Sequence, residues 1–141
     1  MNTLSAGDDA PLFTLNTADG QRYDLAEALG RGPVLAVFFK TTCGTCDLLF
    51  PYLNHFVDGY GGEGWHLWAI SQDGPDRSRD YGRRQEARFP VLVDGPGWPV
   101  SQAYDPPATP TLFLIDRGGG VVQATAGFSK ADLNSLAAAL A

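Results

Sequence analysis

Cysteine is scarce in this sequence. Only 2 of the 141 residues are cysteines, and they form the pair Cys43 and Cys46. A small domain that relies on disulfide bridges carries more cysteines, spread over wider intervals. A framework of structural disulfides is therefore excluded, and an isolated Cys-x-x-Cys pair among alternating strands and helices favours redox chemistry.

The sequence also lacks an excess of positive charge. Its 10 Lys and Arg residues stand against 16 Asp and Glu residues, which gives a formal net charge of -6 at pH 7. Such a chain has no general attraction to phosphate backbones. Nucleic acid is therefore not an expected partner.

Long apolar runs are missing too. No stretch approaches the roughly 20 apolar residues that cross a bilayer as a helix. Residues 1–8 lack the basic start and the apolar segment of a secretory signal. The sequence therefore predicts a cytoplasmic protein with no membrane partner, although an extracytoplasmic form trimmed of its leader would read the same.

What is present is the composition of one folded domain. The chain is 44% hydrophobic and 18% charged, which is typical of a globular protein. Its length is sufficient to bury a core without covalent staples. No repeat or linker divides it, so we expect a single domain over residues 1–141 that works as a monomer without a metal or organic cofactor.

The hydrophobic pattern predicts an α/β fold with a mixed central sheet. The apolar run at 34–39 is typical of a strand buried on both faces, and the apolar spacing after it indicates a helix. An Asp-Gly pair at 19–20 indicates the turn of an N-terminal hairpin. The expected strands cover residues 12–15, 21–24, 34–39, 65–70, 91–93, 111–115 and 121–125, and the expected helices cover 25–29, 43–57, 76–88, 100–104 and 130–140.

The two cysteines stand at the junction between that strand and that helix. A thiol attacks as its thiolate, and the unpaired N–H groups and positive dipole at a helix start favour the charged form of Cys43. Cys46 lies one helical turn further on the same face, so it can resolve a mixed disulfide formed at Cys43. The expected bridge closes a very short loop, so it stabilises little and exchanges readily.

Zinc binding and a static disulfide are the alternatives for this pair. Structural zinc takes four ligands, and beyond the cysteines the chain offers only His55 and His66, which are too widely spaced for a zinc finger. His55 also lies on the opposite side of the helix from Cys46. Both histidines are therefore predicted to be structural.

The residues around the dithiol resemble a known family. The segment 38–46, Phe-Phe-Lys-Thr-Thr-Cys-Gly-Thr-Cys, is similar to the active-site segment of the thioredoxin-like superfamily, in particular of its TlpA-like and AhpC/TSA-related redoxin group. Segments 7–15, 69–73, 89–94 and 110–116 resemble the N-terminal hairpin, central strand ends and C-terminal strand of the same group. The resemblance implies a thioredoxin-like fold with an N-terminal β-hairpin extension.

The resemblance also implies a substrate-binding surface. It makes Thr109-Pro110 the cis-proline loop that faces the dithiol, where the backbone of residue 109 pairs with a substrate chain as an added strand. Taken alone, Pro110 favours a trans proline that blunts the start of a strand, because only about 5% of X-Pro bonds are cis. Thr42, Gly44 and Thr45 around the cysteines complete the expected binding set.

Four positions depart from the family pattern. Thr42 stands where thioredoxins usually carry tryptophan. Thr45 is the second of the two residues between the cysteines, a position where thioredoxins usually have proline. Val37 and Leu49 occupy positions that often hold an aspartate or a glutamate in this group. The reduction potential therefore does not carry over, and the usual proton acceptor for the second cysteine is missing.

Asp47 and Lys40 are the candidates to replace that proton acceptor. An acidic residue in a first helical turn is more often a surface charge that complements the helix dipole, and this is the prediction for Asp47.

The sequence thus predicts a thiol:disulfide oxidoreductase acting on protein or small-molecule disulfides, with Cys43 as nucleophile and Cys46 as resolving thiol. The direction of transfer and the regenerating partner stay open. One alternative is an atypical thiol peroxidase. The peroxiredoxin site resembles Pro-x-x-x-Thr-x-x-Cys, but before Cys43 this chain has Ala36 in place of the proline and Lys40 in place of the threonine. The other is a redox-inactive binding module on the same fold.

Overall fold

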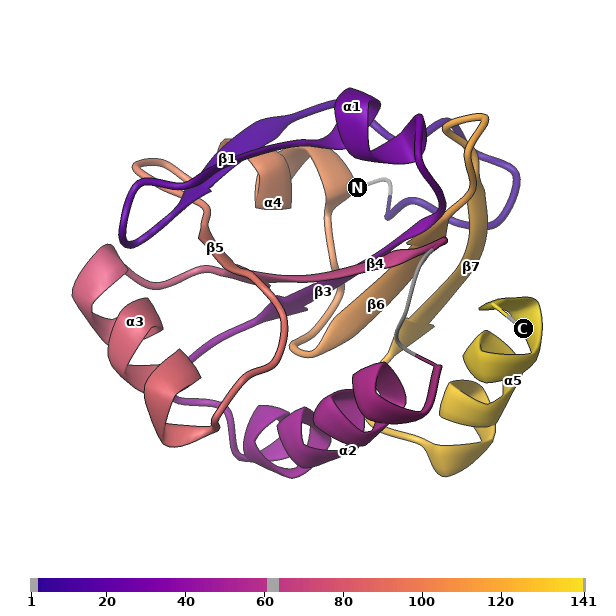
Figure 1. Ribbon diagram of the computed structural model, residues 1–141. Coiled ribbons are helices and arrows are strands. Elements are labelled where there is room, and N and C mark those ends of the chain that lie inside the picture. Colours follow the sequence, from indigo (N-terminus) through magenta and orange to yellow (C-terminus); the bar gives the residue numbers. More distant parts are fainter. Residues whose placement is uncertain (1–2, 61–63, 141) are drawn as a thin grey trace.

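The computed structural model describes residues 3–60 and 64–140 (Figure 1). Its strands are β1 (Thr14–Thr17), β2 (Arg22–Asp24), β3 (Val34–Phe39), β4 (His66–Ser71), β5 (Val91–Val93), β6 (Thr111–Ile115) and β7 (Val121–Ala126). Its helices are α1 (Leu25–Leu29), α2 (Gly44–Tyr60), α3 (Pro75–Arg84), α4 (Pro99–Tyr104) and α5 (Lys130–Leu140).

The strands form one sheet in the order β2-β1-β5-β4-β3-β6-β7. β3 pairs in parallel with β4 and antiparallel with β6, and β4 pairs in parallel with β5. The carboxyl ends of these three parallel strands therefore lie together. We call this line of strand ends one edge of the sheet, and the line of their amino ends the opposite edge. The connections to α2, α3 and α4 all leave from the edge of the carboxyl ends, so it is where side chains from distant parts of the sequence meet.

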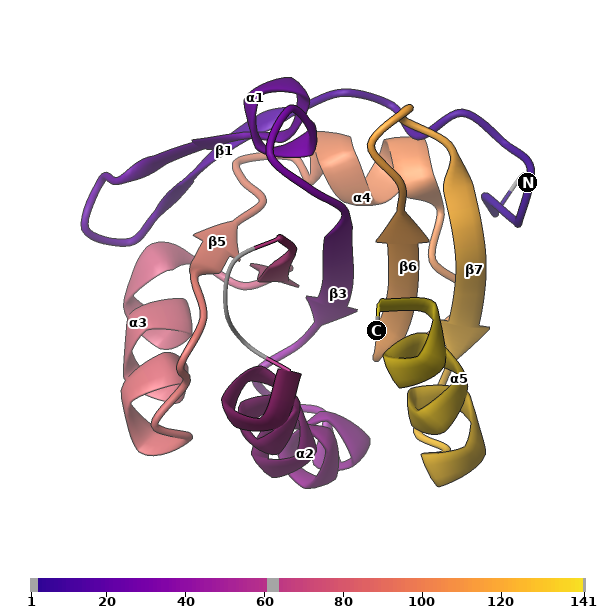
Figure 2. The same ribbon diagram turned by 45° about the vertical axis from the view of Figure 1, so that its right-hand side comes forward.

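Helices cover both faces of the sheet. α2, α3 and α5 lie along one face, and α1 and α4 lie along the other (Figures 1 and 2). β3 divides its side chains between the two cores, because Leu35, Val37 and Phe39 pack with α2 and α5, while alternate residues pack with α1 and α4. Every residue of β3 is fully buried, as its continuous apolar run predicts.

The expected fold class is confirmed, and several element boundaries coincide with the prediction. α1, β3, β5, β6 and α5 have the expected bounds. The N-terminal hairpin is present, and its turn is closed by hydrogen bonds from Gly20 N to Thr17 O and from Thr17 N to Gln21 O. Gly20 adopts a φ of 89°, which glycine reaches without strain.

α3 is shorter than the sequence predicts. The sequence predicts a helix as far as residue 88, stopped by Pro90, but the helix ends at Arg84. Glu86 adopts a left-handed φ of 52°, and Ala87 N donates to Gly82 O at 2.9 Å, which is a Schellman-type closure. Asn54 of α2 binds Gln85 O and Arg88 N across this turn, so contacts distant in sequence fix the end of the helix.

Two smaller differences concern the strand and helix next to the dithiol. α2 begins at Gly44 and continues to Tyr60, with Pro51 inside it, and β4 is displaced by one residue from its expected range.

Among the described helices, none combines the length and the apolar character needed to cross a membrane.

Candidate active site

Cys43 occupies the residue immediately before α2. Its backbone N–H donates to Lys40 O at 3.3 Å, and its carbonyl accepts from Asp47 N at 3.2 Å, which is the first bond of the helix. The Cys46 N–H donates to Cys43 Sγ at 3.3 Å. The sulfur therefore acts as the N-cap of α2 and accepts from a backbone donor that has no partner inside the helix.

The loop that carries Cys43 is fixed from the neighbouring strand. Asp73, which follows β4, accepts from Thr41 N at 2.6 Å and from Thr41 Oγ1 at 2.8 Å, both through Oδ2. Bonds to a carboxylate are stronger than neutral ones, so they hold the start of α2 against the sheet edge. The sequence resemblance included Asp73 as part of a strand end, but nothing in the sequence indicated that it binds Thr41.

The loop before β6 faces the dithiol from the other side. The Thr109-Pro110 peptide bond is cis, and the Cys43 thiol donates to Thr109 O at 3.3 Å. Gly127 N donates to Pro110 O at 2.8 Å, which ties this loop to the end of β7. The predicted geometry of the Thr109-Pro110 loop is thereby confirmed. A second cis proline, at Gly95-Pro96, was not expected.

The two sulfurs have opposite electrostatic environments. Partial burial acts to raise the pKa of Cys43, but hydrogen bonds from the Cys46 thiol, the Cys46 N–H and Thr45 outweigh it, so the pKa lies below its ordinary value. Cys46 is completely buried, and this burial, with its hydrogen bond to Cys43, raises its pKa to about 12. Of the two thiols, Cys43 therefore ionises more readily, and Cys46 holds its proton at neutral pH.

The other residues of the predicted binding set flank the dithiol in the chain. Thr42, Gly44 and Thr45 are exposed beside Cys43. Val37 and Leu49, which replace the acidic residues of related proteins, are completely buried among apolar side chains. They offer no group that could accept a proton.

Asp47 is not a plain surface charge. Its Oδ1 accepts a hydrogen bond of 2.8 Å from the hydroxyl of Tyr81, which comes from α3 and is only 1% exposed. Sequence reasoning missed Tyr81, because 34 residues separate it from Asp47 and no spacing rule links them.

The histidines lie away from the cysteines. His55 is exposed on α2, and His66 is the first residue of β4, at the sheet edge opposite to the dithiol. Within residues 3–60 and 64–140, no three His, Cys, Asp or Glu side chains gather as a metal site.

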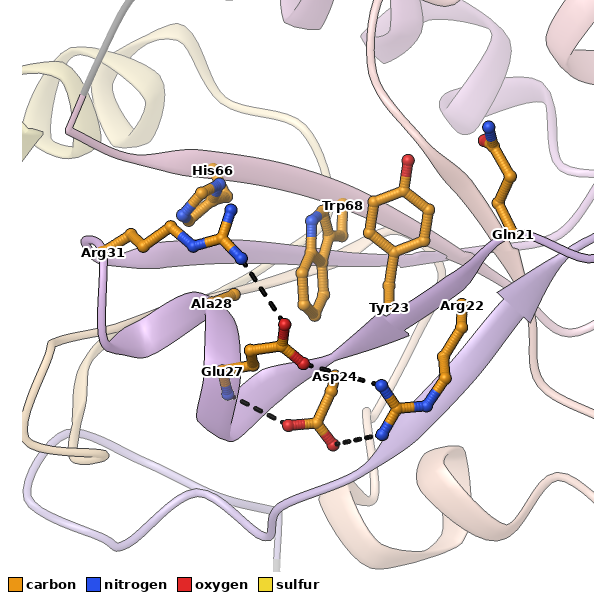
Figure 3. Close-up of a pocket in the computed structure, with 9 residues that line it drawn as sticks. All are labelled: Gln21, Arg22, Tyr23, Asp24, Glu27, Ala28, Arg31, His66 and Trp68. Carbon is orange, nitrogen blue, oxygen red and sulfur yellow. Dashed lines mark hydrogen bonds and ion pairs between the residues drawn. The ribbon is translucent and has the colours of Figure 1, made fainter.

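A hollow of about 440 Å³ also lies at that opposite edge (Figure 3). Its charged side chains already pair with one another, because Glu27 lies 3.5 Å from Arg22 and 3.5 Å from Arg31. Tyr23 and Trp68 form its apolar wall. Nothing in this arrangement leaves a charge free for a ligand.

The fold and the dithiol define a class of protein. A thioredoxin-like sheet with a capping thiolate at a helix start, a buried second thiol and a facing cis-proline loop is the arrangement of a dithiol redox protein.

Comparisons with known proteins agree with this class. Residues 6–124 match the AhpC/TSA family. The thiol-disulfide oxidoreductase ResA of Bacillus thuringiensis subsp. konkukian is 30% identical over 125 residues, which cover 88% of this chain and 71% of that protein. ResA of Bacillus subtilis is 31% identical over 126 residues, covering 89% and 69% of the two chains.

A solved structure extends the match to three dimensions. A Chlorobium tepidum protein, assigned as thiol:disulfide interchange protein DsbE, superposes with a TM-score of 0.86 at 28% identity and covers 99% of this chain and 100% of that one. This chain belongs to the AhpC/TSA family. It is a thiol-disulfide oxidoreductase with a thioredoxin-like fold.

Proposed function

We propose that Cys43 is the attacking thiol of this oxidoreductase and that Cys46 resolves the mixed disulfide. The supporting observation is the contrast between the two sulfurs. Cys43 is partly exposed at the start of α2 with a lowered pKa, and Cys46 is buried beneath it with a pKa of about 12. Only one of the two thiols can meet a substrate.

The exchange follows from this arrangement. In the reducing direction the Cys43 thiolate attacks one sulfur of a substrate disulfide, and the first substrate thiolate leaves and is protonated. Cys46 then loses its proton and attacks Cys43 Sγ. The Cys43–Cys46 bond forms, the mixed disulfide breaks, and two electrons have passed from the protein to the substrate. Oxidation of a partner is the same sequence in reverse.

The substrate chain is proposed to lie between the Thr109-Pro110 loop and the exposed start of α2. The Thr109 carbonyl is 3.3 Å from Cys43 Sγ, so a chain bound to the backbone of Thr109 brings its sulfur to the nucleophile. Thr42, Gly44 and Thr45 form the opposite wall of this surface and carry no charge. An uncharged surface accepts protein disulfides of varied local sequence and also small-molecule disulfides.

The experiment that tests this function is the midpoint potential of the Cys43–Cys46 couple, measured in defined thiol buffers by alkylation and mass spectrometry. We expect a value between about -270 and -120 mV, the range of known exchange catalysts. Cys43→Ser should abolish reduction of a disulfide substrate, and Cys46→Ser should trap it as a mixed disulfide. A bridge that never forms, or that resists reduction below about -300 mV, would favour the peroxidase or binding-module alternatives instead.

We further infer that the chain acts as one domain and as a monomer. The single seven-stranded sheet, whose outer strands are β2 and β7, supports the inference of one domain. The monomeric state is a proposal that the next measurement tests. Sedimentation equilibrium at micromolar concentration should give one species of 15.1 kDa. The cytoplasmic location stays a prediction, which cell fractionation would test.

A further inference from the structure

An exposed apolar face runs along α2, away from the nucleophile. Leu48 is 63% exposed and Tyr52 is 39% exposed, while the apolar side chains on the inner side of the same helix are buried. Leu48 lies one helical turn beyond Gly44, and Tyr52 lies one turn beyond Leu48, so the two side chains follow each other on one side of the helix. This side begins at the residue that adjoins Cys43.

The loop after β7 brings a third apolar side chain to this face. The ring centres of Phe128 and Tyr52 lie 5.0 Å apart. Phe128 directly follows Gly127, whose N–H donates to Pro110 O at 2.8 Å. That bond joins the loop before α5 to the loop whose carbonyl lies 3.3 Å from the sulfur of the nucleophile. The apolar face and the Thr109-Pro110 loop are therefore parts of one continuous surface.

The face continues into a hollow of about 310 Å³ between α2 and α5, which lie side by side (Figures 1 and 2). Phe56 and Leu133 line the hollow and are only 7% and 8% exposed, so its deep part is apolar. His55 and Asn134 add polar groups to its lining. Pockets that enclose a small molecule begin at about 300 Å³, so the hollow has room for a bulky side chain of a partner.

Lys130 places a positive charge beside this hollow. It lines the hollow, and its ammonium lies 5.7 Å from the centre of the Tyr52 ring, whose face attracts a cation. In the part of the chain that the structure describes, no carboxylate forms an ion pair with this ammonium. Because Lys130 is exposed, its charge is available to an acidic group that arrives next to the apolar contacts.

The length of the face sets a spacing for the side chains of a partner. At about 1.5 Å of rise per residue, Leu48 lies about 8 Å and Tyr52 about 14 Å along α2 from Cys43. An extended chain advances about 3.3 Å per residue, so these distances correspond to about two and four residues. Alternate side chains of an extended chain point to the same side, so the second and fourth residues from a partner's cysteine face α2 together with that cysteine.

We propose that this face docks the polypeptide of a protein disulfide that carries bulky apolar residues two and four positions from its reacting cysteine and a carboxylate next to the second of them. The apolar side chains lie against Leu48 and Tyr52 and enter the hollow, and the carboxylate pairs with Lys130. This inference rests on the proposed function and adds a preference among the disulfides that the uncharged surface at Cys43 admits. A small-molecule disulfide reaches Cys43 but makes none of these contacts.

The test compares one reaction with and without a docking sequence. The peptide Cys-Ser-Leu-Ser-Phe-Glu, the peptide Cys-Ser-Ser-Ser-Ser-Gln and 2-mercaptoethanol are each linked through a disulfide to 2-nitro-5-thiobenzoate. Stopped-flow absorbance gives the second-order rate at which the reduced protein releases this coloured thiolate. Each peptide is made in both sequence directions, and the faster one is used. We expect the first peptide to react at least about tenfold faster than the second, because it buries large apolar side chains.

Leu48→Ala should slow the first peptide about fivefold and leave the 2-mercaptoethanol derivative within about twofold, because only the peptide reaches this side chain. Leu12→Ala is the matched control. Leu12 is 65% exposed, much as Leu48 is, but it precedes β1, which is three strands from β3 in the sheet. Its substitution should leave all three rates unchanged.

Lys130→Gln should slow the first peptide about threefold, the upper range for an exposed ion pair. The difference should disappear in high salt, and it should also disappear when the glutamate of the peptide is replaced by glutamine. Lys130→Arg keeps the positive charge and should restore the rate.

The outcomes separate this proposal from the proposed function. If the wild-type dithiol releases no thiolate from the 2-mercaptoethanol derivative, the proposed function itself fails. If that reaction is normal but the two peptides react equally fast, or Leu48→Ala leaves the first peptide at the wild-type rate, the docking face is overturned while the exchange chemistry stands. A dimer in sedimentation equilibrium that Leu48→Asp dissociates would show that a second copy of the chain covers the face, which would also overturn the proposal.

Discussion

The two edges of the sheet differ in how their polar groups are arranged. At the edge where β3 and β4 begin, Arg22, Glu27 and Arg31 form ion pairs of 3.5 Å, and their side chains are between 59% and 71% exposed. At the edge where the same strands end, two thiols meet at a helix start, and one of them is fully buried.

The comparison shows that the number of charges at a site does not make it reactive. Exposed ion pairs contribute about 0–1 kcal/mol each, because water screens them and the long side chains lose entropy when they pair. At the other edge, burial of Cys46 and backbone donors around Cys43 separate the pKa values of two chemically identical groups. The difference between the two thiols, rather than a high density of charge, sets up the reaction.

The largest expected effect is the contrast between the two thiols themselves. Alkylation by iodoacetamide follows the thiolate, so the rate for Cys43 should rise with pH through a midpoint below that of an ordinary cysteine, because its pKa is lowered. Cys46, with a pKa of about 12 and no exposed surface, should react more than about 1000-fold more slowly at pH 7. Mass spectrometry of single-cysteine variants measures both rates.

An unfolded control is needed for this contrast. In guanidinium chloride both thiols should react at the same rate, because the helix start and the core are lost. Equal rates in the folded protein would show that burial does not protect Cys46, and the division of roles between the cysteines would then be wrong.

The next effect concerns the loop that carries the nucleophile. Asp73→Asn keeps the shape of the side chain but removes the charge that receives two bonds from Thr41. We expect a loss of about 1–2 kcal/mol in the free energy of unfolding, the usual range for weakening bonds to a charged group. Urea denaturation at pH 7 measures it, and a change below about 0.3 kcal/mol would show that the loop is held by other contacts.

The sequence predicts this edge of the molecule well where the information is local. The run Val34–Phe39 is bounded by Gly32-Pro33 and by polar residues, so both ends of β3 follow from neighbouring residues. The dithiol stands within four positions, and the helix start that activates Cys43 is adjacent to it. Local patterns of this kind need no knowledge of the tertiary structure.

The missed features depend on residues far apart in the chain. Asp73 lies 32 residues from Thr41, and Tyr81 lies 34 residues from Asp47. The sequence predicts that α3 ends four residues later than it does, because Asn54 of another helix binds across the turn at Glu86. These contacts are fixed by the packing of α2 against α3, which no hydrophobic spacing in a single segment reveals.

The smallest expected effect lies at the opposite edge and tests the comparison from its other side. Glu27→Gln removes the carboxylate shared by Arg22 and Arg31, but all three side chains are more than half exposed. We expect the free energy of unfolding to change by less than about 0.5 kcal/mol. This difference between the variant and wild type should become smaller still in high salt. The rate of disulfide reduction should match wild type, because this edge lies a full strand length from Cys43. A lower rate would mean that the charged hollow takes part in the reaction and that the two edges are coupled.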